Sequence, residues 1–177
     1  PALLLAGIIL LGLGLRIFIL SQRGSLWFDE AFSVHFASMD LRAMWGFLKF
    51  ENNPPLYFAV LHFWMKLFGS SELAVRSLSM IFGLASIPMV YVLGVRLGGT
   101  HGSESNRQVG QAFAWTPNSG SKTAGLFAAF LLAVSTFQVF YATETRMYTM
   151  YLFLALLAVW LFLRNQESRI MNHGLNW

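Results

Sequence analysis

Two adjacent carboxylates, Asp29 and Glu30, stand in the run Ser-Leu-Trp-Phe-Asp-Glu-Ala-Phe-Ser that begins at Ser25, shortly after a long apolar stretch. The chain carries only eight acidic residues among 177. Acidic side chains beside an apolar segment are costly unless they are solvated, paired or used in chemistry. A carboxylate next to an acceptor hydroxyl can act as a general base, so both are candidate catalytic residues. The alternative is that they are first-turn acids favoured by a helix N-terminus.

Three arginines could complement these acids. Arg76, Arg146 and Arg16 each lie at or near the end of an apolar stretch. Arginine holds a phosphate bidentately while charge builds on a leaving group, so all three are candidate donor-phosphate ligands. The rival interpretations are an interfacial anchor for Arg76, a solvated turn for Arg146 with its neighbour Glu144, and a side chain that snorkels to the interface for Arg16.

Geometry separates the two adjacent acids. Neighbouring residues on a helix diverge by about 100°, so Asp29 and Glu30 cannot both face one atom. We expect one to act as the base while the other positions the acceptor or an arginine. A base together with guanidinium groups suits group transfer from a lipid phosphate.

Composition sets the class of protein in which this chemistry occurs. The chain is 56% hydrophobic and 11% charged, against roughly 25% charged for an average soluble domain, and its mean hydropathy is +0.56. These values indicate a membrane protein. The net charge of +4 comes from twelve dispersed basic residues, without a basic stripe that could follow a nucleic acid. The absence of cysteine excludes disulfides and thiolate chemistry.

Apolar stretches predict an all-α polytopic membrane protein with about four transmembrane helices. Because a helix rises 1.5 Å per residue and the hydrocarbon core is about 30 Å thick, stretches of 17–25 apolar residues can span it. The expected spans are 2–20, 73–97, 124–141 and 147–163. We expect residues 1–177 to form the N-terminal part of one transmembrane catalytic domain in a longer protein.

Between the first two spans, the outer loop 21–72 is expected to carry interfacial helices. The aromatic spacing after Phe28, a cap at Asp40 and an apolar segment 56–68 predict three of them. The last has 13 residues, about 20 Å of helix, which is too short to span. The Gly/Ser-rich inner loop 98–123 is expected to be flexible and solvated, and we assign it to the cytoplasm.

Other site chemistries receive little support. No glycine-rich phosphate loop follows a strand pattern, so a nucleotide-sugar enzyme is excluded and the donor should arrive through the bilayer. His35 and His62 lack metal-ligand spacing. A carboxylate pair can hold Mg²⁺ or Mn²⁺, so a divalent metal is left open as a cofactor, but spacing places no third oxygen ligand and no metal ligand is assigned.

Several segments together resemble the family 39 and related membrane glycosyltransferases of the GT-C class, which include the protein O-mannosyltransferases and the lipid A aminoarabinose transferases. The resemblance runs from about Arg16 to Leu163. The matching segments, in order, are Arg16, Ser25–Ser33, Asn53–Phe58, Phe68–Gly69, Arg76–Ser79 and Tyr141–Tyr148.

This resemblance implies a multi-span enzyme in the plasma (inner) membrane, with its active site facing outward on the periplasmic or lumenal side. It implies a polyprenyl-phosphate sugar as donor and a lipid, glycan or protein as acceptor. Asp29 would be the acceptor's base, Arg76 would face the donor phosphate, and Glu144 and Arg146 would border the site.

The resemblance also makes Asn53 and Tyr57 candidates for acceptor contact or positioning. Two positions depart from the family pattern, because Asn53 stands where histidine often precedes Pro-Pro and Thr143 where glutamine is frequent.

The main alternative from another functional class is a transporter or lipid flippase, which should carry polar groups or broken helices at mid-membrane depth. Here the polar candidates gather at one surface instead, although Pro88 and the glycines of 73–97 favour that alternative. A third alternative is a non-catalytic membrane subunit, whose loop acids should tolerate substitution.

Overall fold

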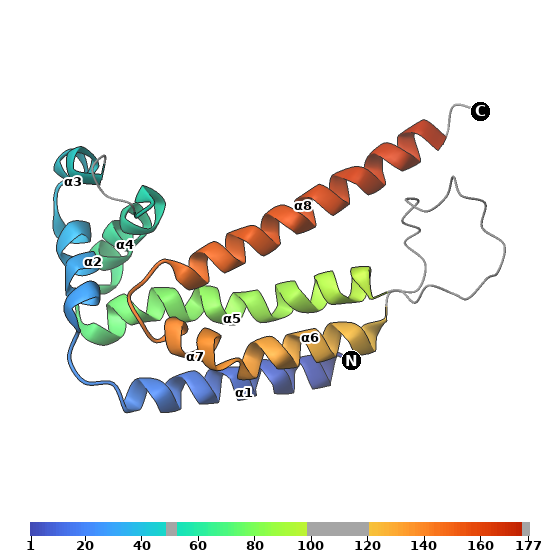
Figure 1. Cartoon of the computed structure of the whole chain (residues 1–177), viewed down its shortest axis with the longest axis horizontal. Helices are drawn as coiled ribbons and strands as arrows, with labels where there is room; N and C mark the ends of the chain where they lie inside the picture. The colour runs from blue at the N-terminus through green and yellow to red at the C-terminus, as the bar shows by residue number, and fades with distance from the viewer. Residues whose placement is uncertain (49–52, 99–120, 175–177) are drawn as a thin grey trace.

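The computed structural model describes residues 1–48, 53–98 and 121–174, and these form eight α-helices without a strand (Figure 1). This confirms the expected all-α class. The expected inner loop 98–123 lies almost entirely outside the described residues. The helices are α1 (Ala2–Ser21), α2 (Phe28–Ser38), α3 (Leu41–Leu48), α4 (Pro55–Phe68), α5 (Glu72–Leu97), α6 (Lys122–Val134), α7 (Thr136–Ala142) and α8 (Tyr148–Gly174).

Three helical segments are long and apolar enough to cross a membrane: α1, α5 and the first 19 residues of α8. The buried share of these windows is 11% for α1 and α8 and 33% for α5. Apolar side chains therefore face outward along most of their length, as lipid-facing helices require. Helix α8 continues to Gly174, beyond the end expected at residue 163.

The stretch expected as one helix over 124–141 is instead two, because α6 and α7 meet at an angle of 57°. Ser135 between them has an extended backbone, with φ −58° and ψ 117°. Serine and threonine compete with the helical backbone for hydrogen bonds and favour helix ends, and Ser135 is followed by Thr136. The pair forms a broken span or a re-entrant segment.

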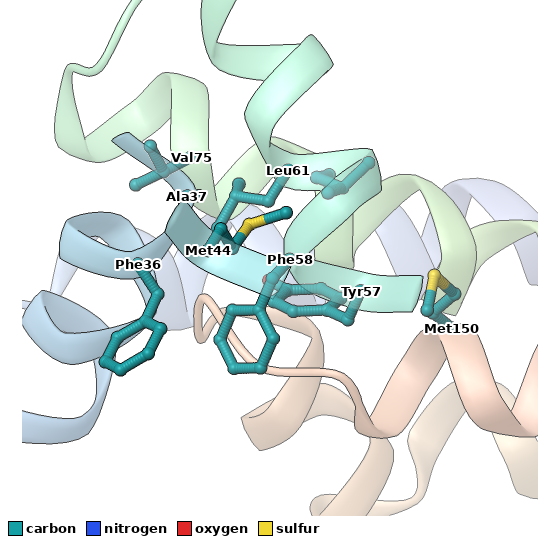
Figure 2. Packing of buried hydrophobic residues seen from close by; sticks show 9 residues of the cluster. Phe36, Ala37, Met44, Tyr57, Phe58, Leu61, Val75 and Met150 are labelled. Carbon is teal, nitrogen blue, oxygen red and sulfur yellow. The ribbon is translucent and has the colours of Figure 1, made fainter. Parts of the chain in front are cut away.

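The outer loop folds into the three short helices that the sequence predicts. Pro55 occupies the first turn of α4 and Gly69 ends it with φ 85°, a conformation that favours glycine. At 14 residues α4 is too short to span, as expected. Its buried face packs with α2, α3, α5 and α8 in a core that contains Phe36, Ala37, Met44, Tyr57, Phe58, Leu61, Val75 and Met150 (Figure 2).

Helices α2, α3 and α4 lie at one end of the bundle, and the turn from α7 to α8 reaches the same end (Figure 1). The N-terminus and the start of α6 lie at the opposite end. The first-loop acids and the turn of residues 143–147 are therefore neighbours, although more than a hundred residues separate them in sequence.

Candidate active site

A pocket of about 500 Å³ opens at this end of the bundle. Four of the residues predicted from sequence line it: Asp29, Arg76, Glu144 and Arg146. The predicted residues Glu30, Arg16, Asn53 and Tyr57 do not. The complete lining is Arg23, Gly24, Ser25, Trp27, Asp29, Arg76, Phe140, Tyr141, Glu144, Arg146 and Tyr148.

Glu30 and Arg76 form a buried, two-pronged ion pair beside the pocket. Arg76 Nε donates to Glu30 Oε1 at 2.9 Å and Nη2 donates to Oε2 at 2.8 Å. The two side chains are 0% and 3% exposed. Planar guanidinium and carboxylate groups match in this geometry, and a buried pair of this kind needs every remaining donor and acceptor satisfied.

Further hydrogen bonds meet that requirement. The backbone N–H of Thr145 donates to Glu30 Oε1 at 2.9 Å, and that of Trp27 donates to Oε2 at 3.4 Å. Burial favours a raised pKa for Glu30, but the hydrogen bonds from Arg76 and Thr145 outweigh it and hold the pKa below its ordinary value. Glu30 therefore joins α2, α5 and the 143–147 turn as a charged carboxylate.

Arg76 also holds the segment that leads into α2. Its Nη1 donates to the Gly24 carbonyl oxygen at 3.1 Å and its Nη2 to the Ser25 carbonyl oxygen at 3.4 Å. Protein groups thus occupy most of the donor atoms of this guanidinium. Arg76 lines the pocket, but its hydrogen bonds hold neighbouring parts of the protein together.

Asp29 lies in the first turn of α2, as does Glu30, but its side chain opens into the pocket. It is 39% exposed, and Arg146 Nη1 approaches its Oδ2 at 3.5 Å. Arg146 also donates from Nη2 to the Tyr148 hydroxyl at 3.4 Å. Burial acts to lower the pKa of Arg146, but the hydrogen bond to Tyr148 and the nearby acids raise it, so the guanidinium stays charged.

Arg23, which the sequence analysis did not single out, brings a second guanidinium to the pocket. Its Nη1 donates to Glu144 Oε1 at 3.1 Å, and its guanidinium lies 4.2 Å from the centre of the Phe140 ring. Burial raises the pKa of Glu144 despite this partner. A basic residue two positions after the end of the first span, in the loop that carries the paired acids, was the available signal.

Tyr57 is fully buried, does not line the pocket and reaches the 143–147 turn through Ser79. Ser79 Oγ donates to the Arg146 carbonyl oxygen at 3.0 Å, so the Tyr57 hydroxyl donates to Ser79 Oγ at 3.1 Å. Burial raises the pKa of Tyr57, which keeps its hydroxyl protonated. This network fixes the backbone at Arg146, which makes Tyr57 a positioning residue in this structure. Asn53 is half-buried near the start of α4.

Arg16 lies in the bundle interior and is 0% exposed. Its Nη1 donates to the carbonyl oxygens of Gly12 at 2.9 Å and Ala133 at 3.4 Å. It therefore does not snorkel to the interface.

No group of three or more potential metal-ligating side chains is present in the part of the chain that the structure describes. His62 instead makes a 2.7 Å hydrogen bond between its Nδ1 and the Ala37 carbonyl oxygen.

The chain matches a known protein family. Residues 53–177 match the family described as Protein O-mannosyl-transferase TMEM260 N-terminal domain. No curated protein and no solved structure matches the chain.

The matched segment includes Arg76, Glu144 and Arg146 but begins after Asp29 and Glu30. The two acids nevertheless contact the matched segment, because Glu30 pairs with Arg76 and Asp29 with Arg146. The match supports the mannosyltransferase part of the resemblance, whereas membership of family 39 stays a prediction. With more than half of its residues matched, the chain belongs to this protein O-mannosyltransferase family, a family of glycosyltransferases.

Proposed function

We propose that this chain carries the sugar-transfer site of an integral membrane glycosyltransferase of the GT-C class. The enzyme moves a mannose-like sugar from a polyprenyl phosphate to an acceptor hydroxyl. The observation that carries the proposal is a half-exposed carboxylate, Asp29, that shares one pocket with the guanidinium groups of Arg23 and Arg146 at the end of an apolar helical bundle.

Asp29 serves as the general base in this proposal. It takes the proton of the acceptor hydroxyl as the hydroxyl oxygen attacks the anomeric carbon. The new carbon–oxygen bond forms as the bond from the anomeric carbon to the phosphate oxygen breaks. The bonding electrons leave with the phosphate, and the configuration at the sugar inverts. Glu30 does not compete for this role, because both of its oxygens accept hydrogen bonds from Arg76 and the backbone.

Arg146 and Arg23 are the better candidates for stabilising the departing phosphate. Among the described residues each forms an ion pair with one acid, at 3.1 Å for Arg23 and 3.5 Å for Arg146, and both line the pocket. Arg23 Nη2 also donates to the Phe140 carbonyl oxygen at 3.4 Å. Arg76 was the expected phosphate ligand, but its donors already bind Glu30 and two backbone carbonyl groups. The structure supports a role for Arg76 in holding Asp29 in place, because Asp29 is next to its partner Glu30.

A membrane-embedded donor fits the position of the pocket. The helices below it are apolar and long enough to cross a bilayer, while the pocket is lined by charged and aromatic side chains. A polyprenyl chain could lie along the bundle with its phosphate at the arginines. We assign the pocket to the outward, periplasmic or lumenal face, opposite the end of the bundle at which α6 begins (Figure 1).

The experiment is sugar transfer by the intact protein in membranes, supplied with radiolabelled polyprenyl-phosphate mannose or with nucleotide-linked mannose. We expect transfer from the lipid donor only, and loss of transfer in Asp29→Asn. Asp40→Asn is the matched control, because Asp40 is an exposed acid outside the pocket. Direct transfer from the nucleotide sugar would contradict the donor assignment. Movement of the lipid donor across the bilayer without transfer would favour a flippase.

A further inference from the structure

The mechanism leaves one buried charge unused, Arg16 in α1. Its side chain is fully buried, and two of its three nitrogen atoms, Nε and Nη2, have no hydrogen-bond partner among the residues that the structure describes. A buried guanidinium in a membrane-spanning helix is costly, and such groups are usually retained for a purpose. The question is what this cation contributes inside the bundle.

Its contacts point to the break between α6 and α7. Arg16 Nη1 lies 3.4 Å from the carbonyl oxygen of Ala133, in the last turn of α6. The last carbonyl groups of a helix have no partner within that helix, and they carry partial negative charge. Because the extended backbone of Ser135 ends α6 inside the bundle, a cation from a neighbouring helix is well placed to stabilise that end.

The surrounding residues leave space for this side chain. A Cβ atom added at Gly12 would lie 3.1 Å from Arg16 Nη1, and one added at Gly83 would lie 3.5 Å from Arg16 Nε. A Cβ at Gly83 would also lie 2.9 Å from the Cβ of Ala142, the last residue of α7. Arg16 and the end of α7 therefore occupy adjoining space against α5.

The geometry points to Arg16 as a positioning residue. We propose that its buried guanidinium caps the broken end of α6 and thereby fixes the angle at which α7 delivers the 143–147 turn to the pocket. That turn carries Glu144 and Arg146. The segment that carries Asp29 is held mainly from α5, by the bonds of Arg76 to Glu30 and to the carbonyl oxygens of Gly24 and Ser25, and one hydrogen bond from the Thr145 N–H to Glu30 links it to the turn. Loss of the cap should therefore displace the 143–147 turn more than the start of α2, which Arg76 holds from α5.

Hydrogen exchange of the intact protein in lipid nanodiscs tests this proposal without reference to activity. In Arg16→Met we expect amide exchange over residues 136–147 to rise by about 10-fold, with residues 28–38 unchanged. Ser86→Ala is the matched control, because Ser86 is also buried and, within the described part of the chain, its hydroxyl donates only to the Phe82 carbonyl oxygen of its own helix. Unchanged exchange over 136–147, or an equal rise over 28–38, would overturn the proposal.

Arg16→Lys covers the case in which the methionine variant does not accumulate. Its ammonium group can still donate to a carbonyl oxygen, although it presents fewer donors. We expect a smaller rise in exchange, confined to the same residues. A rise spread over all helices, or none at all, would contradict the capping role.

Enzyme kinetics distinguish a positioning role of Arg16 from a general loss of stability. This kinetic experiment rests on the proposed function. Because Arg146 stands on the affected turn and Asp29 does not, Arg16→Met should raise the KM for the lipid donor by about 10-fold and change kcat less. Arg16→Lys should recover part of the loss. A fall in kcat at constant KM would mean that fewer molecules are folded, and would overturn the positioning role. If no transfer activity exists, the hydrogen-exchange result still decides whether Arg16 caps α6.

Discussion

Asp29 and Glu30 are neighbours in sequence, and each meets an arginine, yet the two ion pairs differ in almost every physical respect. Glu30 and Arg76 are buried, with the closest atoms 2.8 Å apart. Asp29 and Arg146 lie 3.5 Å apart, with side chains 39% and 14% exposed. The comparison teaches that residue type alone does not identify the catalytic acid; the surroundings of each carboxylate do.

The difference follows from helix geometry. Both acids stand in the first turn of α2, where successive side chains diverge by about 100°. Glu30 therefore points toward α5 and the 143–147 turn, while Asp29 points into the pocket. Exposed ion pairs are worth only about 0–1 kcal/mol, so a substrate can replace Asp29 as the partner of Arg146 at little cost. A substrate cannot replace Glu30 as the partner of Arg76 in this way, because breaking a buried ion pair leaves an uncompensated charge in the interior.

The largest expected effect breaks the buried pair. Arg76→Met leaves Glu30 charged and unpaired in the interior, which should lower the free energy of unfolding by about 3–5 kcal/mol. Thermal unfolding of the purified protein in detergent or nanodiscs measures it. The double variant Glu30→Met with Arg76→Met should be more stable than Arg76→Met alone. A double variant that is less stable than either single variant would contradict the assignment of these residues as a pair.

The second prediction concerns the open side of the pocket. Arg146→Gln and Arg23→Gln should each raise the KM for the lipid donor by about 10- to 100-fold, because each removes a charge-assisted hydrogen bond to the phosphate. Arg146→Gln should change the thermal stability little, whereas Arg23→Gln should also lower it, because it leaves the buried Glu144 without its partner. Arg42→Gln is the control, because Arg42 is an exposed arginine of α3 outside the pocket. Unchanged donor KM in both pocket variants would exclude them as phosphate ligands.

A third prediction uses pH to distinguish the acids. The pKa of Glu30 is held below 4.5 in the folded protein, so the stability that its pair contributes is present above pH 4.5 and is lost as pH falls through the lowered pKa. The melting temperature of the parent should therefore fall more steeply below pH 4.5 than that of Glu30→Gln. Parallel curves for the two proteins would show that Glu30 is not stabilised as a carboxylate.

The smallest effect is expected at Glu144, where the sign is reversed. Burial raises its pKa, so its charged form at neutral pH destabilises the fold relative to the protonated form. Glu144→Gln should raise the free energy of unfolding at pH 7 by less than about 1 kcal/mol, and this gain should vanish below pH 4.5, where the carboxyl is protonated in both states. A loss of stability at pH 7 would show that the pair with Arg23 outweighs burial.

Much of the fold could be read from the sequence, because long apolar stretches and short aromatic helices leave strong patterns. The break at Ser135 could not, since the apolar pattern continues through it and only a Ser-Thr pair marks it. The number of expected spans placed the loop with Asp29 and the turn with Glu144 and Arg146 on the same side of the membrane, so their proximity could be predicted. Which arginine pairs with each acid depends on the direction and burial of the side chains, which the sequence pattern does not give. For the same reason the sequence did not indicate that Arg23 lines the pocket or that Arg16 is buried.

The most direct test compares the two neighbouring acids by two measurements on the same preparations of the intact protein: sugar transfer from polyprenyl-phosphate mannose and thermal unfolding. Asp29→Asn should lose transfer by about 10²- to 10⁴-fold and keep the parental melting temperature. Glu30→Gln should lower the melting temperature and, where it is folded, keep more transfer than Asp29→Asn. Substantial transfer by folded Asp29→Asn would contradict its role as the base.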